Sequence, residues 1–358
     1  MNQRGPMIGW PFMASLVVGW AALWLVSPAD PAQALTAYLA AWILSLGIPL
    51  GSLCLLMIHA LTGGDWGLEL RDDWIDAIRF LPFALALSLP LLCGAPWLFE
   101  WARSAHDGHV ALRYLNLPFF YARCAVCFAC WLILAHGARR RAARASWQGY
   151  AAGGSILMLL SVSIWAVDWI MSRVEGWHST ALGVTLFASQ LLAALAFTTW
   201  RRLHAGSRAC PTPVRHDMAN LLLVAALGWG YLAFMDYLTA WISDLPADNV
   251  WYLPRLRSDW AWLGAALAML ATTGIVLLLS RVVKRSARAL RWLAGIMVVM
   301  QAAYGVWLVL PDVHPAGLAL SWRAPLAWLC AAIPAICAWV PHRSRTDSND
   351  AHALDAST

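Results

Sequence analysis

Long apolar stretches separated by short polar connections dominate the chain, and they predict membrane-spanning helices. Each stretch has about 20 residues with few charges, which is the length an α-helix needs to cross a bilayer. We expect spans at 8–26, 35–61, 77–98, 117–136, 150–171, 180–200, 217–242, 258–280, 288–310 and 321–340. The predicted fold is therefore all-α integral membrane, with one polytopic domain of about ten transmembrane helices over 1–340. The polar segment 341–358 is expected to be a disordered tail.

The basic residues are distributed unequally between the two sides of these predicted spans. Of the 25 Lys and Arg residues, 16 lie in connections on one side and five in connections on the other. Cytoplasmic loops of membrane proteins carry an excess of Lys and Arg. This bias places both termini in the cytoplasm, in agreement with an even number of spans, and predicts a multi-pass membrane protein.

Composition supports this interpretation and excludes several classes of protein. Hydrophobic residues make up 61% of the chain and charged residues 12%, whereas soluble chains are about 25% charged. A soluble enzyme, a nucleic-acid binder and a disulfide scaffold are excluded as the main interpretation. The first apolar run precedes Ala32-Gln33-Ala34, which resembles a signal cleavage site. That run is longer than a signal-peptide core, so we expect a retained helix.

Ionisable residues within predicted spans are costly to bury in lipid and therefore mark candidate functional positions. Four stand out: Asp168 and Asp236 near the outer ends of their spans, Arg123 near the outer end of another, and His59 at the cytoplasmic end of the second span. One hypothesis is an outer polar pocket of Arg123, Asp168 and Asp236 that takes up or releases a proton. The alternative is an Arg–Asp bridge that only joins helices.

Metal-site signals in the sequence are weak. Cys124, Cys127 and Cys130 have part of an iron–sulfur spacing, but the fourth Cys is missing and the run lies within a predicted span. His59 and His136 both end spans on the cytoplasmic side and could bracket a haem, although interfacial histidines are usually solvated. We predict no metal ligands and no catalytic constellation in this chain alone.

Several sequence blocks together resemble a known family. These blocks are His59-Ala60-Leu61-Thr62-Gly63-Gly64-Asp65-Trp66-Gly67, Asp168-Trp169-Ile170-Met171-Ser172, Gly176-Trp177-His178-Ser179-Thr180 and Asn249-Val250-Trp251-Tyr252-Leu253-Pro254-Arg255. The chain is similar over about residues 35–285 to the NrfD-like membrane subunits of alternative complex III, a quinol:electron-acceptor oxidoreductase. It is most similar to the second such subunit, usually called ActF.

The resemblance implies an architecture and a set of partners. The fold would be two four-helix bundles, formed by spans 2–5 and 6–9, flanked by spans 1 and 10. The chain would hold no cofactor of its own beyond a quinone or quinol. Haem c and iron–sulfur clusters would belong to partner subunits, together with a sister NrfD-like subunit and, in some assemblies, a terminal oxidase.

The resemblance also assigns positions to a path for protons. It places His59 on the inner half of such a path, and five residues on the outer side, namely Asp168, Trp169, Ser172, Trp177 and Ser179. Two residues depart from the family pattern, where a neutral Leu is expected instead of Arg173 and a Gln instead of Asp236. A new Arg and a new Asp on the same side could form a pair, which would preserve neutrality, or they could mean that this copy has drifted from the respiratory role.

We therefore expect an integral membrane subunit of a quinol-oxidising respiratory complex in a bacterial inner membrane, which gives structural support, quinone access and proton transfer. Asp168→Asn should lower quinol-linked turnover while the complex still assembles. A membrane anchor of a polysulfide- or tetrathionate-type reductase, a stand-alone transporter or proton channel, and a purely structural subunit remain alternatives. Broken helices in both halves of the chain would favour a transporter, but Pro82 and Pro90 interrupt only the first half.

Overall fold

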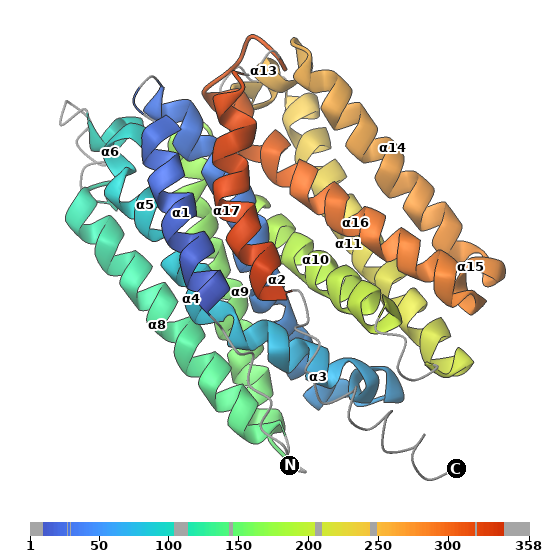
Figure 1. Ribbon diagram of the computed structural model, residues 1–358. Helices are drawn as coiled ribbons and strands as arrows, with labels where there is room; N and C mark the ends of the chain where they lie inside the picture. The colour runs from blue at the N-terminus through green and yellow to red at the C-terminus, as the bar shows by residue number, and fades with distance from the viewer. Residues whose placement is uncertain are drawn as a thin grey trace, which may run out of the picture.

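The computed structural model describes residues 10–26, 28, 30–103, 114–142, 146–204, 210–243, 249–318 and 321–339. Helices, turns and loops make up these residues, and none of them lies in a β-strand (Figure 1). The predicted all-α class is therefore confirmed for the described part of the chain. The tail expected at 341–358 lies outside it.

Eight helical segments are long and apolar enough to cross a membrane. Seven are single helices: α2 (Pro31–Thr62), α8 (Leu117–Arg141), α9 (Gln148–Trp169), α10 (Leu182–His204), α11 (Thr212–Ser243), α14 (Trp260–Leu279) and α16 (Ala287–Val309). The eighth is the broken segment Asp65–Cys93. The first and last predicted spans form α1 (Trp10–Val26) and α17 (Arg323–Trp339), which are apolar but only 17 residues long. A multi-pass membrane architecture fits these helices, while the count of ten spans stays a prediction.

We expected the third span, 77–98, to be one continuous helix, but the structure shows that it is broken. It begins in the last turn of α3 (Asp65–Arg79) and continues as α4 (Leu81–Ala86), α5 (Leu89–Cys93) and α6 (Ala95–Leu98). Each of the last three has a proline at its first turn, namely Pro82, Pro90 and Pro96. Proline lacks the N–H that a continuous helix requires and clashes with the preceding turn, so the chain restarts at each one.

Side chains from neighbouring helices satisfy carbonyl groups along this broken segment. The indole of Trp42 donates to the Ala84 carbonyl at 2.6 Å, and the Tyr38 hydroxyl donates to the Leu87 carbonyl at 3.0 Å. A backbone acceptor left unpaired at membrane depth would cost several kcal/mol, about the transfer cost of an amide. The aromatic residues of α2 therefore stabilise a break that lipid alone would not tolerate.

The α3 helix was not expected from hydropathy, because it is amphipathic and carries seven charged residues. It lies across the lower end of the molecule in Figure 1. Trp74 and Leu70 are buried, while Asp73 and Glu69 form ion pairs with Arg201 and Arg202 of α10, respectively. An apolar face against the helices and charges toward the last turn of α10 fit a helix at the membrane surface.

The α2 helix is the centre of the molecule. Every residue from Gln33 to Met57 except Leu44 is buried. Gly47 and Gly51 lie one turn apart and face α10, and a Cβ on Gly51 would come within 2.1 Å of the Gln190 carbonyl oxygen. Small residues at this spacing allow two helix backbones to approach closely in a membrane.

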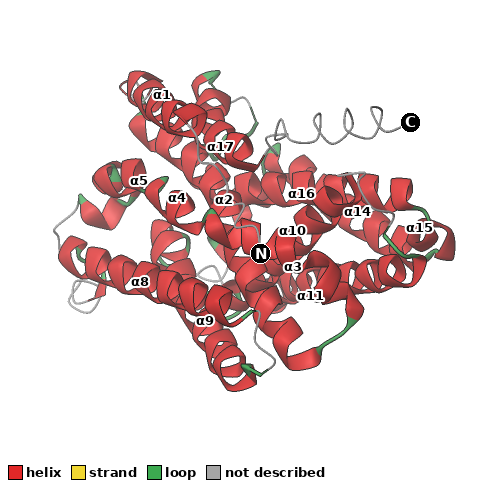
Figure 2. Cartoon of the chain, turned by 60° about the horizontal axis from the view of Figure 1, so that its bottom comes forward, coloured by secondary structure: helices red, strands yellow, loops and turns green. Residues whose placement is uncertain are grey.

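The remaining helices are arranged around α2 (Figure 2). On one side lie α4, α5, α8 and α9, and on the other lie α10, α11, α14 and α16, while α1 and α17 pack together against α2. Short helices occur at the ends: η2 (Glu100–Ala102), η3 (Met171–Arg173), α13 (Tyr252–Leu256), α15 (Arg281–Arg285) and η4 (Leu310–Asp312). We call the two sets the first half and the second half. Their identity with NrfD-like bundles stays a prediction.

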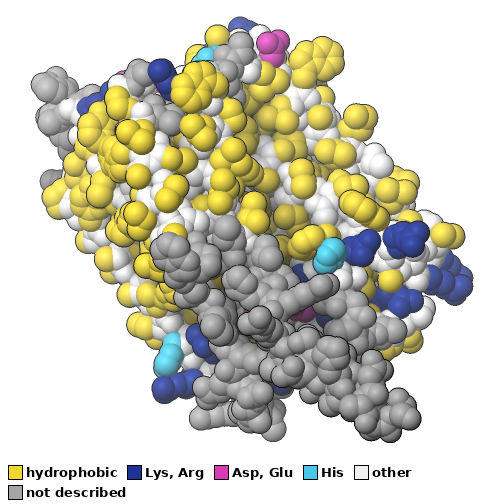
Figure 3. Space-filling model, viewed as in Figure 1, with side chains coloured by type: hydrophobic (Ala, Val, Ile, Leu, Met, Phe, Trp, Pro, Cys, Tyr) yellow, Lys and Arg dark blue, Asp and Glu magenta, His cyan; other side chains and the backbone are white. Residues whose placement is uncertain are grey.

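The outer surface is largely apolar over its flank, and basic side chains gather at the lower end near α15 (Figure 3). Exposed side chains include Leu25, Val126 and Val299, which are 82%, 68% and 68% exposed. Such contiguous apolar surface marks a lipid or protein contact on a chain of this kind. The basic end agrees with the side predicted to be cytoplasmic, and the opposite end is called the upper end below.

Candidate functional site

Two of the four predicted ionisable residues form an ion pair at the upper end of the first half. Arg123 of α8 donates from Nε to Asp168 Oδ2 at 2.8 Å and from Nη2 to Asp168 Oδ1 at 2.9 Å. Their side chains are 10% and 3% exposed. The flat guanidinium matches both carboxylate oxygens at once, which is the strong form of such a pair. Arg123 also donates to the Tyr114 carbonyl.

Aromatic side chains lie close to this pair, and the Arg123 guanidinium lies over the rings of Tyr114 and Phe119. Trp169, which follows Asp168, is fully buried, and its ring lies 4.7 Å from Trp42 and 5.4 Å from Phe120. Ser172 donates to the Asp168 carbonyl at 2.6 Å and accepts from the Trp101 indole. Asp168, Trp169 and Ser172 therefore share one site, and aromatic rings pack closely around it.

Asp236 belongs to a different site, at the upper end of the second half. Its carboxylate accepts a hydrogen bond from the Ser179 hydroxyl at 2.6 Å and one from the Tyr252 hydroxyl at 2.7 Å. The Ser179 hydroxyl in turn accepts from the Leu182 backbone N–H and so caps the first turn of α10. A carboxylate on α11 is thus connected to the start of α10 and to α13.

The charge environment of Asp236 differs from that of Asp168. Within the described residues, no Arg, Lys or His forms an ion pair with Asp236, and the residue is half-buried rather than fully enclosed. Burial and, secondarily, the Asp236 carboxylate raise the pKa of the Tyr252 hydroxyl far above its usual value. Tyr252 therefore remains a hydrogen-bond donor at any physiological pH.

A third charged cluster lies beside Asp236, and hydropathy did not predict it. Asp312 forms an ion pair with Arg255 at 2.6 Å and with Arg173 at 3.5 Å, and the side chains of all three are at most 4% exposed. Arg255 also donates to the carbonyls of Trp251 and Leu308. Two buried cations thus share one carboxylate, and backbone carbonyls supply the remaining acceptors.

These contacts correct two sequence-based expectations. The polar pocket of Arg123, Asp168 and Asp236 does not form as one site, because Asp236 lies in the second half with Ser179 and Tyr252. The expected pair between Arg173 and Asp236 is also wrong. Arg173 donates to Thr36 at 2.9 Å and pairs with Asp312, which the sequence analysis did not select. Charged residues meet where their helix ends lie side by side in the fold, whatever their separation in the sequence.

Trp177 links the third cluster to Ser179. Its ring stacks on Trp251 with centroids 4.6 Å apart and planes inclined by 7°. The guanidinium of Arg255 lies over the same Trp251 ring at 3.7 Å from its centroid, a cation–π contact. The outer residues that the resemblance implied are therefore divided, with Asp168, Trp169 and Ser172 in the first half and Trp177 and Ser179 in the second.

His59 lies at the lower end, far from both carboxylates, as its predicted position at the end of the second span requires. Its Nε2 is 3.0 Å from the Gly64 carbonyl oxygen, so that nitrogen is the donor. The rings of Trp66 and Trp74 meet it edge-on or tilted at 5.3 and 6.2 Å. His59 is thus a partly exposed group in an aromatic setting beside α3.

The cysteines of α8 are the ones that the sequence singled out as a metal-site signal. Cys124 and Cys127 are buried on α8, Cys130 is partly exposed and His136 is exposed on the same helix. Within the described ranges, no three His, Cys, Asp or Glu side chains are placed to hold one metal ion.

The sequence did contain a signal for the missed cluster. Few basic residues lie on the side predicted to be outside, and the positive-inside rule makes each of them unusual. Two of those few, Arg173 and Arg255, turn out to be the buried cations. A basic residue on the side predicted to be outside therefore points to a buried acidic partner. For Arg173 and Arg255 that partner is Asp312, which lies just after α16.

Comparison with known proteins adds no relative, since no protein-family model and no curated protein matches the chain. The family resemblance carried by the four sequence blocks is therefore still a prediction.

Proposed function

We propose that the chain is an integral membrane subunit of a quinol-oxidising respiratory complex. It would hold helices together, give quinone access through the membrane and move protons at the upper end of its second half. Haem c and iron–sulfur clusters would carry electrons in partner subunits. The family part of this proposal depends on the sequence blocks around His59, Asp168, Trp177 and Arg255.

The observation that carries the proton-transfer part is the setting of Asp236. Two hydroxyl donors hold its carboxylate, with no ion-paired cation among the described residues, and the site is partly open to the surface. Uptake of a proton by a carboxylate without an ion-paired cation does not leave a buried cation unpaired. Ser179 and Tyr252 are suited to orient that proton.

Asp168 is less suited to the same task. Arg123 engages both of its oxygens, so protonation would break a bidentate pair and leave a buried guanidinium unpaired. This geometry favours the alternative in which Arg123 and Asp168 join α8 to α9. The earlier expectation that Asp168→Asn lowers turnover stays a prediction, and Asp236 becomes the stronger candidate.

The stand-alone transporter is the less favoured alternative. Transporters of this size often place broken helices in corresponding positions of two halves. Here the proline breaks occur in α4 to α6, whereas the described helices α10, α11, α14 and α16 of the second half each run without a break. The reductase anchor shares the proposed fold and quinone, and its partners would distinguish it.

The first experiment is affinity purification of the tagged chain from its native membrane, followed by mass spectrometry. The proposal expects c-type cytochromes, an iron–sulfur protein and a second NrfD-like subunit to co-purify. A molybdopterin-containing partner would indicate the reductase anchor instead. A chain that purifies alone, without haem or iron, would contradict membership of a respiratory complex.

The second experiment tests the residue. Asp236→Asn should lower quinol-linked turnover of the assembled complex by about tenfold or more, the lower range for removing a proton-transfer group. The matched control is Asp217→Asn, which changes an exposed carboxylate of the same helix. Turnover that remains at the wild-type level in an intact Asp236→Asn complex would rule out the proton role.

A further inference from the structure

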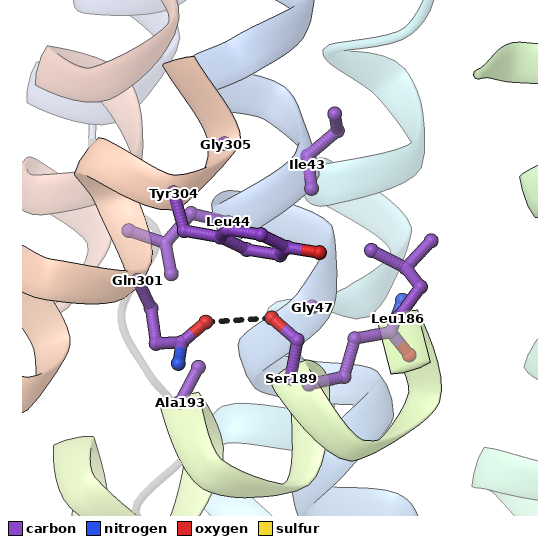
Figure 4. Close-up of a pocket in the computed structure, with 10 residues that line it drawn as sticks. Ile43, Leu44, Gly47, Leu186, Ser189, Ala193, Gln301, Tyr304 and Gly305 are labelled. Atoms are coloured by element: carbon purple, nitrogen blue, oxygen red, sulfur yellow. Dashed lines mark hydrogen bonds between the residues drawn. The ribbon is translucent and has the colours of Figure 1, made fainter. Parts of the chain in front are cut away.

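A small cavity lies between α2, α10 and α16, where these three helices meet (Figure 4). Its polar groups come from Ser189, Gln190, Gln301 and Tyr304, and Gly47 leaves room for it because it has no side chain. Its volume is about 10 Å³, which is close to the room that one water molecule requires. The cavity lies between the two halves of the molecule, and its Tyr304 stacks on Trp307, whose carbonyl accepts a hydrogen bond from Arg255 of the third cluster.

Two buried amides line this cavity without sufficient hydrogen-bond partners. Gln190 and Gln301 are each 3% exposed. Neither the oxygen nor the nitrogen of the Gln190 amide has a partner, and the Gln301 nitrogen also lacks one. The only bond shown is from the Ser189 hydroxyl to Gln301 Oε1 at 2.6 Å (Figure 4). Buried polar groups in folded proteins are almost always satisfied, so these atoms indicate an occupant.

We propose that the cavity is an internal water-binding site whose water joins the amides of Gln190 and Gln301. A water molecule is both donor and acceptor and makes about three hydrogen bonds in such positions. The free Gln301 N–H can donate to it, and the Gln190 oxygen can accept from it. Because both ends of the Gln190 amide are free, either orientation of that amide completes the arrangement.

The chemistry of the lining disfavours other small occupants. No lining residue carries a carboxylate or a formal charge, and an uncompensated cation at the centre of a membrane protein is strongly disfavoured. The free amide nitrogens would also repel a cation. An empty cavity would leave at least three polar atoms unsatisfied, whereas cavities that stay dry are lined by apolar groups.

The water would complete a chain of protic groups across the junction. Tyr304 projects its hydroxyl into the same space, on the side of the cavity opposite Ser189 (Figure 4). Gly47 keeps this space open, because a Cβ there would stand 3.2 Å from the Gln190 side chain. The water would therefore connect α10 to α16 through hydrogen bonds, while α2 contributes the apolar wall of Ile43 and Leu44 and the gap at Gly47. This inference does not depend on the proposed respiratory function.

The direct test is a high-resolution cryo-electron microscopy map of the full chain, in its native complex or bound to a rigid antibody fragment. We expect spherical density within about 2.7–3.2 Å of polar atoms of both Gln190 and Gln301. Amides that have turned to bond each other directly, or density of a larger molecule, would overturn the proposal.

A second test uses variants and thermal unfolding in detergent. Gln190→Leu and Gln301→Leu should each lower the midpoint, and the double variant should lower it by less than the sum, because both single changes remove the same water. Thr198→Val is the control, since that buried hydroxyl on α10 bonds only its own helix backbone. Additive shifts would mean that no shared water joins the amides.

A third test separates water from a cation. The midpoint of the wild-type chain should be the same in sodium, potassium and choline chloride at equal ionic strength. A shift with sodium or potassium that disappears in Gln301→Leu would show that the cavity binds a cation and would overturn the proposal of water.

Discussion

Asp168 and Asp236 are carboxylates at the same end of the molecule, but their surroundings are opposite. Asp168, in the first half, has a bidentate arginine and is almost fully enclosed. Asp236, in the second half, has only hydroxyl donors and is partly open. The comparison teaches that burial of an acidic residue in a membrane helix does not by itself mark a proton site. The identity of its partners decides whether its charge is fixed or free to change.

The charge of the third carboxylate, Asp312, is the most strongly fixed of the three. Its replacement should therefore cause the largest loss of stability. Asp312→Asn removes the counter-charge of both Arg173 and Arg255, which are buried. We expect at least the cost of breaking one buried pair, about 3–5 kcal/mol, measured as loss of folded monodisperse protein after detergent extraction. Asp259→Asn, an exposed carboxylate at the same end, should extract normally. Normal extraction of Asp312→Asn would refute the structural role.

The Arg123–Asp168 pair should show a large effect that a second change relieves. Arg123→Gln leaves the buried Asp168 carboxylate uncompensated and should cost about 3–5 kcal/mol. Adding Asp168→Asn removes that charge, so the double variant should unfold at a higher temperature than Arg123→Gln alone. Intrinsic tryptophan fluorescence during heating measures both. A double variant less stable than either single one would contradict a simple charge lock.

Loss of a hydrogen bond from α2 to the broken segment should lower the stability of the protein by an intermediate amount. Trp42→Phe removes the indole donor to the Ala84 carbonyl, so a buried acceptor is left unsatisfied at a cost of about 1–3 kcal/mol. The control is Trp97→Phe, because Trp97 is 43% exposed. Equal thermal midpoints for both variants would show that the Ala84 carbonyl finds another donor.

Asp236 should give the smallest effect on stability, which is the sharpest contrast with Arg123. In Asp236→Asn, the amide oxygen still accepts one hydroxyl and the other hydroxyl can turn to accept from the amide nitrogen, so we expect a loss of about 1 kcal/mol or less. Thermal unfolding measures it on the same preparation used for turnover. A loss as large as that of Arg123→Gln would mean that Asp236 is also a structural charge.

Hydropathy predicted the long helices because bilayer thickness fixes their length and composition. It failed at 77–98, where Pro82 and Pro90 were visible but the run still averaged as apolar. It also missed α3, whose seven charged residues lower its mean hydropathy. These errors share a cause, since a window average cannot register either a missing N–H or an amphipathic face.

The candidate site was predictable only in part. The Arg123–Asp168 pair followed from two ionisable residues at the same depth on consecutive spans. Asp236 was selected correctly as an unusual residue, but its partners come from segments 57 residues before it and 16 residues after it, and spacing along one helix says nothing about them. Gln190 and Gln301 carry no charge, so ionisable groups within spans do not point to them, although a buried amide also requires hydrogen-bond partners.

The glycines of α2 impose an order on biogenesis. Gly47 and Gly51 leave a groove that α10 fills, yet α10 begins at Leu182, after four of the long apolar segments, α2 included, have been synthesised. During that interval the groove faces lipid or the insertion machinery. A ribosome stalled before α10 would therefore present an unfinished α2 surface to quality-control proteases, and release of α10 is the step that closes it.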